Sequence, residues 1–363
     1  MSLHRFLQNA ISEWMRVKGP ESDIIFSSRI RLARNLTDLP FPMLSNSSQA
    51  EQVVEMVEAA WKEDPPEVLK DAELVRMKDL SDLEKRVLVE KHLISPHLAE
   101  DSEYGAVLLN QDESVSIMLN EEDHIRIQCL FPGLQLKLAG KLASELDDWL
   151  ERHLNIAFEE NYGYVTSCPT NFGTGIRASV MIHLPALAMT QQLNRILPAI
   201  TQVGLAVRGI YGEGSEALGQ LYQVSNQVTL GPSEEEILEK LEGVVAQMIN
   251  QEENARERLR QLSSVQLEDR FFRAFGILQH ARVMDSKEAM RRLSDVRLGI
   301  DMGFIKDLPS SVMNELMVVI QPGFLQLYAG EKLGAEERDM RRAELIRERM
   351  RINDFPEEFD STK

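Results

Sequence analysis

Residues 120–126 read Asn-Glu-Glu-Asp-His-Ile-Arg, a run in which three adjacent acids precede a histidine and an arginine. If these residues form a regular strand, side-chain alternation places Glu122, His124 and Arg126 on one face. A carboxylate beside an arginine is often a solvated surface pair that contributes little to stability. The run therefore indicates a reactive site only if other segments supply matching chemistry.

An arginine-rich segment supplies such chemistry. Residues 27–31 read Ser-Ser-Arg-Ile-Arg, and Arg34 follows. Arginines two positions apart on a strand point the same way, and neighbouring guanidinium groups repel each other unless an anion lies between them. A polyphosphate would meet that demand through bidentate hydrogen bonds. The alternative interpretation is a solvated basic edge.

Two loops with glycines complete the set. Residues 168–175 read Cys-Pro-Thr-Asn-Phe-Gly-Thr-Gly, where small residues let the backbone approach a ligand and Cys168 is a candidate thiolate. A tight turn with a buried cysteine is the alternative. Residues 208–216 read Arg-Gly-Ile-Tyr-Gly-Glu-Gly-Ser-Glu, and the central Glu213 could close over a site on a lid. Dinucleotide-binding, Walker A and protein-kinase signatures are absent.

These four segments, in this order, resemble the catalytic domain of the phosphagen (guanidino) kinases over residues 20–250. The resemblance implies that Glu122 and Glu213 are the catalytic acids holding the acceptor guanidinium, with Cys168 in the substrate pocket. It also implies ATP as phosphate donor, with Mg²⁺ carried on the phosphates and no dedicated metal site. The nucleotide-binding residues that it implies are Ser27, Ser28, Arg29, Ile30, Arg31, His92, Arg126, Arg177, Ala178, Ser179, Val180, Met181, Arg208, Gly209, Ile210, Tyr211 and Gly212.

The order of the two halves indicates which subgroup of the family the chain resembles. Phosphagen kinases carry a helical domain before the catalytic one, whereas here the matching region begins near the N-terminus and a helical half follows. This arrangement resembles the bacterial protein-arginine kinases and favours an arginine side chain on a protein as acceptor. Within that group, Arg338, Asp339 and Arg342 would form an allosteric phosphoarginine-binding site. The alternative is a solvated helix rich in Glu and Arg.

The hydrophobic pattern predicts an α+β fold. Many short β signals with few βαβ units indicate a large antiparallel sheet flanked by helices, in a catalytic domain over residues 1–254. From Pro232 onward the pattern is almost entirely helical, which predicts an all-helical domain over residues 255–363. The charged residues 252–260 are a candidate boundary. Strands are expected at residues 23–35, 105–110, 114–120, 123–130, 162–166, 177–184, 205–210 and 222–229.

Bulk composition excludes several classes of protein. The net charge of −18 argues against direct binding to nucleic acid or an anionic membrane, because both need a basic face. Cys129 and Cys168 are the two cysteines, which favours a reducing cytoplasm over a disulfide scaffold. Residues 1–19 do not resemble a signal peptide, and the apolar residues 178–189 are too few to cross a bilayer.

The resemblance carries further implications for partners. It implies a bacterial stress response in which protein substrates, among them a stress-gene repressor, are phosphorylated. An activator protein and a Clp-type protease that reads the phosphoarginine mark would be the other partners. Independently of the resemblance, a homodimer through the helical half is expected from its apolar positions, and the simpler alternative is that these positions form that domain's own core. They are Phe271, Phe272, Phe275, Leu278, Met313, Leu316, Met317 and Leu325. A kinase for free arginine, a phosphoarginine-binding adaptor without catalysis and an ATPase scaffold remain as alternatives.

Overall fold

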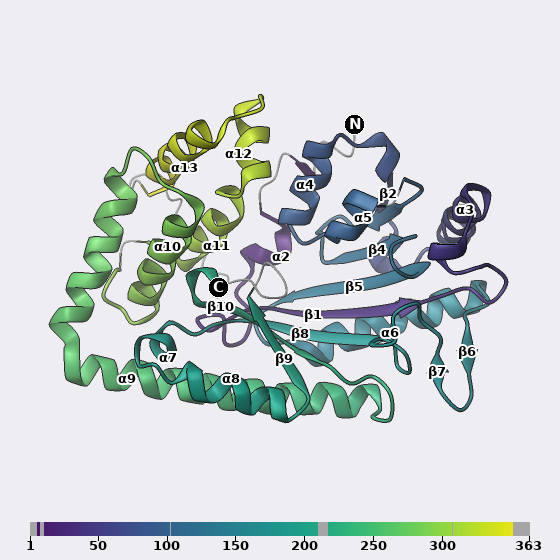
Figure 1. The fold of residues 1–363 in the computed structure, drawn as a ribbon, viewed down its shortest axis with the longest axis horizontal. Coiled ribbons are helices and arrows are strands. Elements are labelled where there is room, and N and C mark those ends of the chain that lie inside the picture. Colours follow the sequence, from purple (N-terminus) through teal and green to yellow (C-terminus); the bar gives the residue numbers. More distant parts are fainter. Residues whose placement is uncertain (1–5, 8–10, 102, 210–216, 307, 351–363) are drawn as a thin grey trace, which may run out of the picture. The chain divides into compact units, whose positions relative to one another are not determined.

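The computed structural model describes residues 6–7, 11–101, 103–209, 217–306 and 308–350 (Figure 1). The chain separates into two compact units, Met1–Ala255 and Arg256–Lys363. The first contains a large sheet with helices, and the described part of the second consists of helices. Among the described residues, no helix is both long and apolar enough to cross a membrane.

An antiparallel sheet forms the centre of the first unit. In the described residues it has eight strands, in the order β2-β3-β4-β5-β1-β8-β10-β9. Strand β1 (Ile25–Arg34) runs between β5 (Ile125–Pro132) and β8 (Ile176–His183) (Figure 1). The other strands are β2 (Glu73–Arg76), β3 (Ala106–Leu109), β4 (Val115–Leu119), β9 (Leu205–Gly209) and β10 (Leu221–Asn226), and β6 (Phe158–Glu159) pairs separately with β7 (Gly163–Tyr164). The predicted α+β class with a large antiparallel sheet is confirmed.

Helices flank this sheet, and local capping chemistry defines several of their starts. Ser81 and Glu84 form a capping box at the start of α4, and the pair formed by Ser233 and Glu236 makes the same reciprocal bonds. The helices are α2 (Glu13–Arg16), α3 (Ser47–Glu63), α4 (Asp82–Glu90), α5 (Pro96–Asp101), α6 (Leu136–His153), α7 (Pro185–Met189), α8 (Leu193–Gln202) and the first part of α9 (Glu234–His280).

The two faces of the sheet have opposite character because strand side chains alternate. Helix α6 packs on β1 and β5, and the β1 residues on that side, including Ile30 and Leu32, are almost completely buried. Ile127 on β5 and Val180 on β8 are buried in the same layer. From Ser27 onward, the odd-numbered residues of β1 therefore project from the other face, and this is the side on which Arg29 and Arg31 lie.

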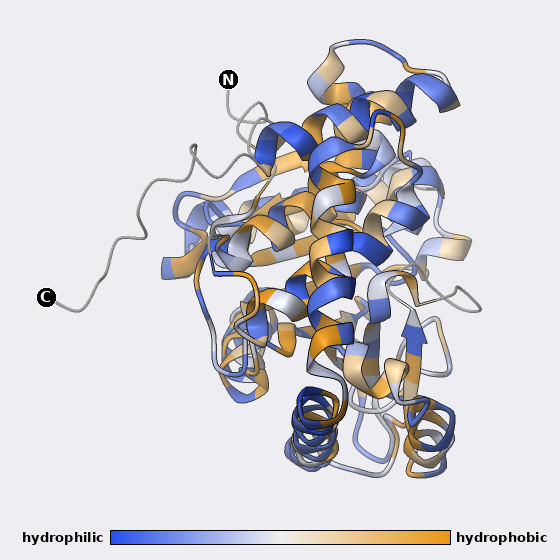
Figure 2. Ribbon diagram, turned by 90° about the vertical axis from the view of Figure 1, so that its left-hand side faces the viewer, coloured by the Kyte–Doolittle hydropathy of each residue, from blue (hydrophilic) through white to orange (hydrophobic). Residues whose placement is uncertain are grey.

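The second unit buries the apolar residues of its helices. It contains the rest of α9 with α10 (Ser286–Asp301), α11 (Ser310–Val319), α12 (Pro322–Ala329) and α13 (Ala335–Arg349). Phe271, Leu278, Met313 and Leu316 are fully buried, whereas Phe272 is 46% exposed. Hydrophobic and hydrophilic residues are interleaved along the helices (Figure 2), as expected for elements that bury one side. Most of these apolar positions thus form the unit's own core.

The division between the units falls within α9, at the charged residues 252–260. This segment is part of a helix and not a solvated linker. Glu252 is 0% exposed, and its carboxylate accepts hydrogen bonds from the backbone N–H groups of Ala186 and Leu187 at 3.0 and 2.9 Å. A buried acid that satisfies two backbone donors explains why a charged residue lies on the inner side of this helix.

Replacing Glu252 with Ala should destabilise the first unit. The change leaves two buried N–H groups without an acceptor, so we expect the free energy of unfolding to fall by roughly 3 kcal/mol. Urea denaturation followed by circular dichroism measures the loss. The neighbouring Glu253→Ala, at an exposed position, is the matched control and should change stability by less than about 0.5 kcal/mol. Equal stabilities of the two variants would contradict this assignment.

Candidate active site

Strand register gathers the arginines on one face of the sheet. Arg31 on β1 lies opposite Arg177 on β8, and Ala33 lies opposite Arg126 on β5. At the far side, Gln223 on β10 lies opposite Arg208 on β9. Because paired residues on adjacent strands share a face, segments separated by up to about two hundred residues in sequence meet there.

A cavity of about 210 Å³ opens on this face. Two loops and five strands contribute to its lining. The lining residues are Arg31, Ala33, Glu122, Arg126, Thr170, Asn171, Gly175, Arg177, Arg208 and Gln223. Four arginines with one glutamate form an unusual wall, because like charges at such proximity repel each other.

Electrostatics at the arginines indicate an anion site. Burial and the neighbouring Arg177 and Arg126 lower the pKa of Arg29 to about 10, and burial with adjacent arginines lowers the pKa of Arg31 as well. Arg29 is held by Gln223 at 2.7 Å and more weakly by Ser179 at 3.3 Å. In contrast, the buried Nε of Arg31 has no hydrogen-bond partner. A bound polyphosphate would supply that partner and relieve the repulsion.

The acidic run forms a tight turn before β5. Asn120 adopts φ +56°, and its N–H donates to the carbonyl of His124 at 2.9 Å. Arg126, near the start of β5, is held by both glutamates: its guanidinium lies 2.7 Å from Glu121 and 3.0 Å from Glu122. Glu121 is buried, whereas the side chain of Glu122 is 38% exposed. Glu122 is thus the acid available to an incoming group.

His124 does not share the face of Glu122 and Arg126. Its side chain is completely buried, its Nδ1 accepts from the N–H of Leu36 at 3.1 Å, and its Nε2 lies 2.9 Å from the carbonyl oxygen of Pro40. Burial lowers the pKa of this imidazole. The alternation expected for residues 122–126 fails because the chain turns at 120–124 and the strand begins only at Ile125.

The loop of Cys168 reaches the cavity through its neighbours. Thr170 and Asn171 line the cavity, whereas Cys168 is not among the lining residues. Cys168 is half-buried, with its Sγ 3.1 Å from the hydroxyl of Thr170. The hydroxyl of Thr229 anchors the loop by donating to the carbonyls of Thr170 and Phe172 at 3.1 and 2.7 Å.

The other expected nucleotide-binding residues divide between the faces. Ser27, Ser179 and Met181 share the register of the arginine face, and Gly209 ends β9 beside Arg208. Ser28, Ile30, Ala178 and Val180 are turned to the buried face against the core. Glu213, Ile210, Tyr211 and Gly212 lie outside the described residues.

His92 lies close to the arginine face. It adopts φ +60°, and its carbonyl accepts a hydrogen bond from Gln128 of β5 at 2.8 Å. Burial, together with the nearby charge of Arg29, lowers the pKa of its imidazole to about 4. The ring is therefore neutral at physiological pH and suited to contact an uncharged base or sugar.

Sequence reasoning missed two residues of the site. Gln223 lines the cavity and holds Arg29, but only its pairing opposite Arg208 reveals this. Glu121 is chemically identical to Glu122, and its structural role follows only from its burial and its contacts with Arg126 and Ser95. Among the described residues, no cluster of three or more His, Cys, Asp or Glu side chains is arranged to hold a metal ion.

Replacing Arg31 with Met tests the anion site. Removing one of several clustered cations should raise the unfolding free energy of the ligand-free protein by about 1 kcal/mol, at the expense of function. The stabilisation that pyrophosphate gives the wild type should be largely lost. Thermal denaturation with and without pyrophosphate measures both effects, and the exposed Arg195→Met on α8 is the control. Undiminished stabilisation of Arg31→Met by pyrophosphate would refute the assignment.

Comparison with known proteins covers both halves of the chain. Residues 52–255, more than half of the chain, match the family described as "ATP:guanido phosphotransferase, C-terminal catalytic domain". Residues 264–360 match "Protein-arginine kinase McsB C-terminal domain". The catalytic-domain match includes the turn of Glu122, the Cys168 loop and the strands that carry most of the arginines.

Relatives that match over nearly their full length exist at high identity. The chain is 60% identical over 354 residues to a protein-arginine kinase of Geobacillus sp. (strain WCH70), covering 98% of both chains. It is 61% identical over 354 residues to one of Halalkalibacterium halodurans, covering 98% of this chain and 99% of that one.

Solved structures share the fold. A taurocyamine kinase from Schistosoma mansoni matches with a TM-score of 0.59 at 25% identity, over 65% of this chain and 34% of that one. A lombricine kinase matches with a TM-score of 0.57 at 21% identity, over 66% of this chain and 74% of that one. The expected resemblance is therefore confirmed, and the chain belongs to the protein-arginine kinase family, within the ATP:guanido phosphotransferases.

Proposed function

We propose that this protein transfers the γ-phosphate of ATP to the guanidinium group of arginine residues in proteins. The observation that carries the proposal is the cavity in which Glu122 faces a wall of arginines. Such a wall suits the phosphates of ATP, and an exposed carboxylate beside it suits a cationic acceptor. Full-length relatives named protein-arginine kinases support the choice of acceptor.

The arginines would bind and polarise the phosphates. Arg29, Arg31 and Arg177 lie side by side on β1 and β8, where their forks can reach several phosphoryl oxygens at once. Charge spreads over these oxygens in the transition state, so fixed positive groups stabilise it without reorganising. Mg²⁺ would arrive on the ATP phosphates, as is common for this ion, and would neutralise part of their charge.

Glu122 would prepare the acceptor. An arginine guanidinium is a poor nucleophile because its pKa exceeds about 12. The Glu122 carboxylate can orient it and accept a proton from one nitrogen as that nitrogen attacks the γ-phosphorus. The new N–P bond forms as the P–O bond to ADP breaks, which yields ADP and phosphoarginine. Glu213 would be the second acid, and Cys168 would flank the guanidinium.

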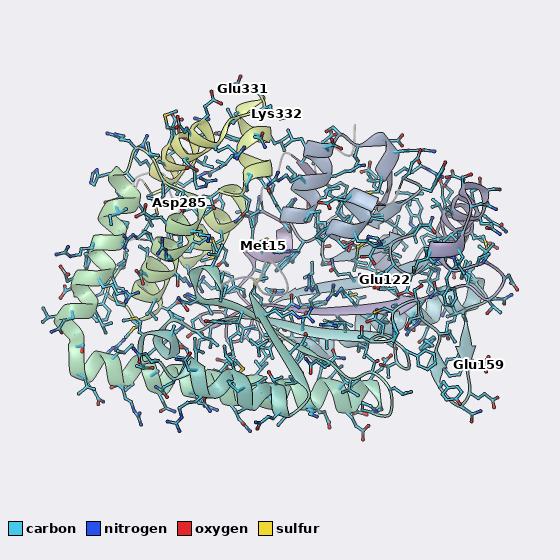
Figure 3. The ribbon with its side chains drawn as sticks, in the orientation of Figure 1. Met15, Glu122, Glu159, Asp285, Glu331 and Lys332 are labelled. Carbon is cyan, nitrogen blue, oxygen red and sulfur yellow. The ribbon has the colours of Figure 1, made fainter. Side chains whose placement is uncertain are left out.

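Glu122→Gln tests this role. The amide keeps the shape of the side chain but cannot accept the proton, so we expect phosphorylation to fall by about a hundredfold or more. Mass spectrometry of a protein substrate incubated with Mg·ATP at neutral pH measures phosphoarginine. Glu159→Gln is the control, because Glu159 lies on the β6–β7 hairpin and not beside the central strands (Figure 3). Near-normal phosphorylation by Glu122→Gln would show that another group is the base.

The helical unit contains the residues proposed as a phosphoarginine-binding regulatory site. Arg342 is buried, and it donates to the carbonyls of Ile320 and Met284 at 2.9 Å each and to Asp339 at 2.5 Å. These bonds fix Asp339, whose side chain is 32% exposed. Arg338, one helical turn before Arg342, donates to the carbonyl of Leu333 at 2.9 Å. Asp339 could bind the guanidinium of a ligand and Arg338 its phosphoryl group, while Arg342 supports both.

Arg338→Ala should weaken binding of free phosphoarginine by about tenfold or more, since a charge-assisted hydrogen bond is lost. Isothermal titration calorimetry measures the affinity directly. Arg349→Ala on the same helix is the control, because Arg349 pairs with Glu315 and is 46% exposed. If both variants bind phosphoarginine as the wild type does, the regulatory site lies elsewhere.

The proposal extends to the wider role of the protein, which family membership supports. We propose a stress-response function in the bacterial cytoplasm, where the phosphoarginine mark directs proteins to a Clp-type protease. A repressor would be among the substrates, an activator protein would control the kinase, and the helical unit would mediate homodimerisation. Two free cysteines are consistent with a reducing compartment. Sedimentation analysis over a range of concentrations tests the proposed dimer.

A further inference from the structure

Arg34 differs from the other arginines of β1. It occupies an even position, so it projects toward α6 and away from Arg29 and Arg31, and its side chain is 0% exposed. Its Nε lies 2.9 Å from Asp147, and its Nη2 lies 2.6 Å from the same carboxylate. Glu234, at the start of α9, lies 3.8 Å away. This guanidinium is fully engaged inside the protein and cannot contribute to phosphate binding.

The other edge of the Arg34 guanidinium binds the loop 168–175, which contains Cys168. Nη1 donates to the carbonyls of Ala33 at 2.9 Å and Thr174 at 3.1 Å. The next residue, Gly175, has φ +68°, and a Cβ there would come within 2.5 Å of Nη1. Only glycine allows so close an approach without a shift of the loop or the arginine.

Tyr164 completes the attachment. Its ring lies over the Arg34 guanidinium, with the Cζ atom 3.3 Å from the ring centroid. The backbone of Tyr164 also pairs with Gly173, through hydrogen bonds of 2.7 and 3.2 Å. Thus Arg34 reaches residues 173–175 directly through Thr174 and indirectly through Tyr164. The same short segment joins Asn171 and Gly175, which line the cavity, to Arg177.

We propose that Arg34 is a positioning residue that fixes the loop 168–175 against α6, and thereby aligns the acceptor guanidinium with the γ-phosphate. The proposal rests on the function proposed above. An arginine suits this place because its planar fork can bind a carboxylate along one edge and carbonyl oxygens along the other. A lysine cannot do both. Buried ion pairs add little net stability over apolar residues, so a role in alignment accounts for Arg34 better than stability does.

Two variants test the proposal. Arg34→Lys keeps the charge opposite Asp147 but loses the bonds to Thr174. The double variant Arg34→Gln/Asp147→Asn removes both charges together. It therefore does not leave the Asp147 carboxylate buried without a partner, which could unfold the protein. For both we expect kcat/KM for the protein substrate to fall at least tenfold, while the affinity for ATP stays within twofold of the wild type. Glu252→Ala is the control for general destabilisation. The Glu252 carboxylate bonds to the start of α7, so this variant should keep a normal kcat/KM for the protein substrate.

A second readout does not depend on catalysis. Cys129 is completely buried, so thiol alkylation of the folded protein reports on Cys168 in the loop. We expect the alkylation rate to rise several-fold in both Arg34 variants and to remain unchanged in Glu252→Ala. If the wild type phosphorylates no protein arginine, the proposed function fails, yet the alkylation rates still decide whether Arg34 fixes the loop.

Two outcomes overturn the proposal. Unchanged Cys168 alkylation in a folded Arg34 variant would show that the loop does not depend on this residue. If the ATP affinity and the kcat/KM for the protein substrate fell by the same factor, in parallel with the thermal stability, Arg34 would be shown to support the fold as a whole.

Discussion

Strand β1 has to satisfy two incompatible environments at once. Its even positions enter an apolar layer against α6, while its odd positions carry cations toward water and toward ligand. The two-residue period of a strand makes this possible, because neighbouring side chains point to opposite faces. Antiparallel pairing with β5 and β8 then repeats the pattern, so Arg29, Arg31, Arg126 and Arg177 from three strands meet on the face opposite the apolar layer, whereas Arg34 points into that layer.

The clustered cations make the site electrostatically costly before any ligand binds. Burial and mutual repulsion lower the pKa of Arg29 and of Arg31. Some of this repulsion is offset by acids, as where Glu121 and Glu122 both pair with Arg126. A polyphosphate would neutralise the positive charge that the acids leave uncompensated. The repulsion between the arginines thus lowers the stability of the ligand-free protein and strengthens the binding of an anion.

Buried polar side chains connect the loops to this sheet. Asp123 accepts hydrogen bonds from the Asn35 side chain at 2.7 Å and from the N–H of Ser167 at 2.6 Å, and it is completely buried. The turn that carries Glu122 is thereby tied to the loop that carries Cys168 and to the end of β1. The acceptor side of the site thus depends on contacts between segments that are far apart in the chain.

The sequence by itself determined the fold class, the family and the arginine-rich strand, because these depend on local alternation and on short motifs. It did not determine that His124 is buried, that Glu121 is structural while Glu122 is exposed, or that Arg34 faces α6. It also could not identify Gln223 as part of the cavity. These outcomes depend on a turn at residues 120–124 and on strand register, which are set by contacts between residues as much as two hundred positions apart. Only the tertiary structure decides which of several identical side chains lies in the core and which faces the ligand.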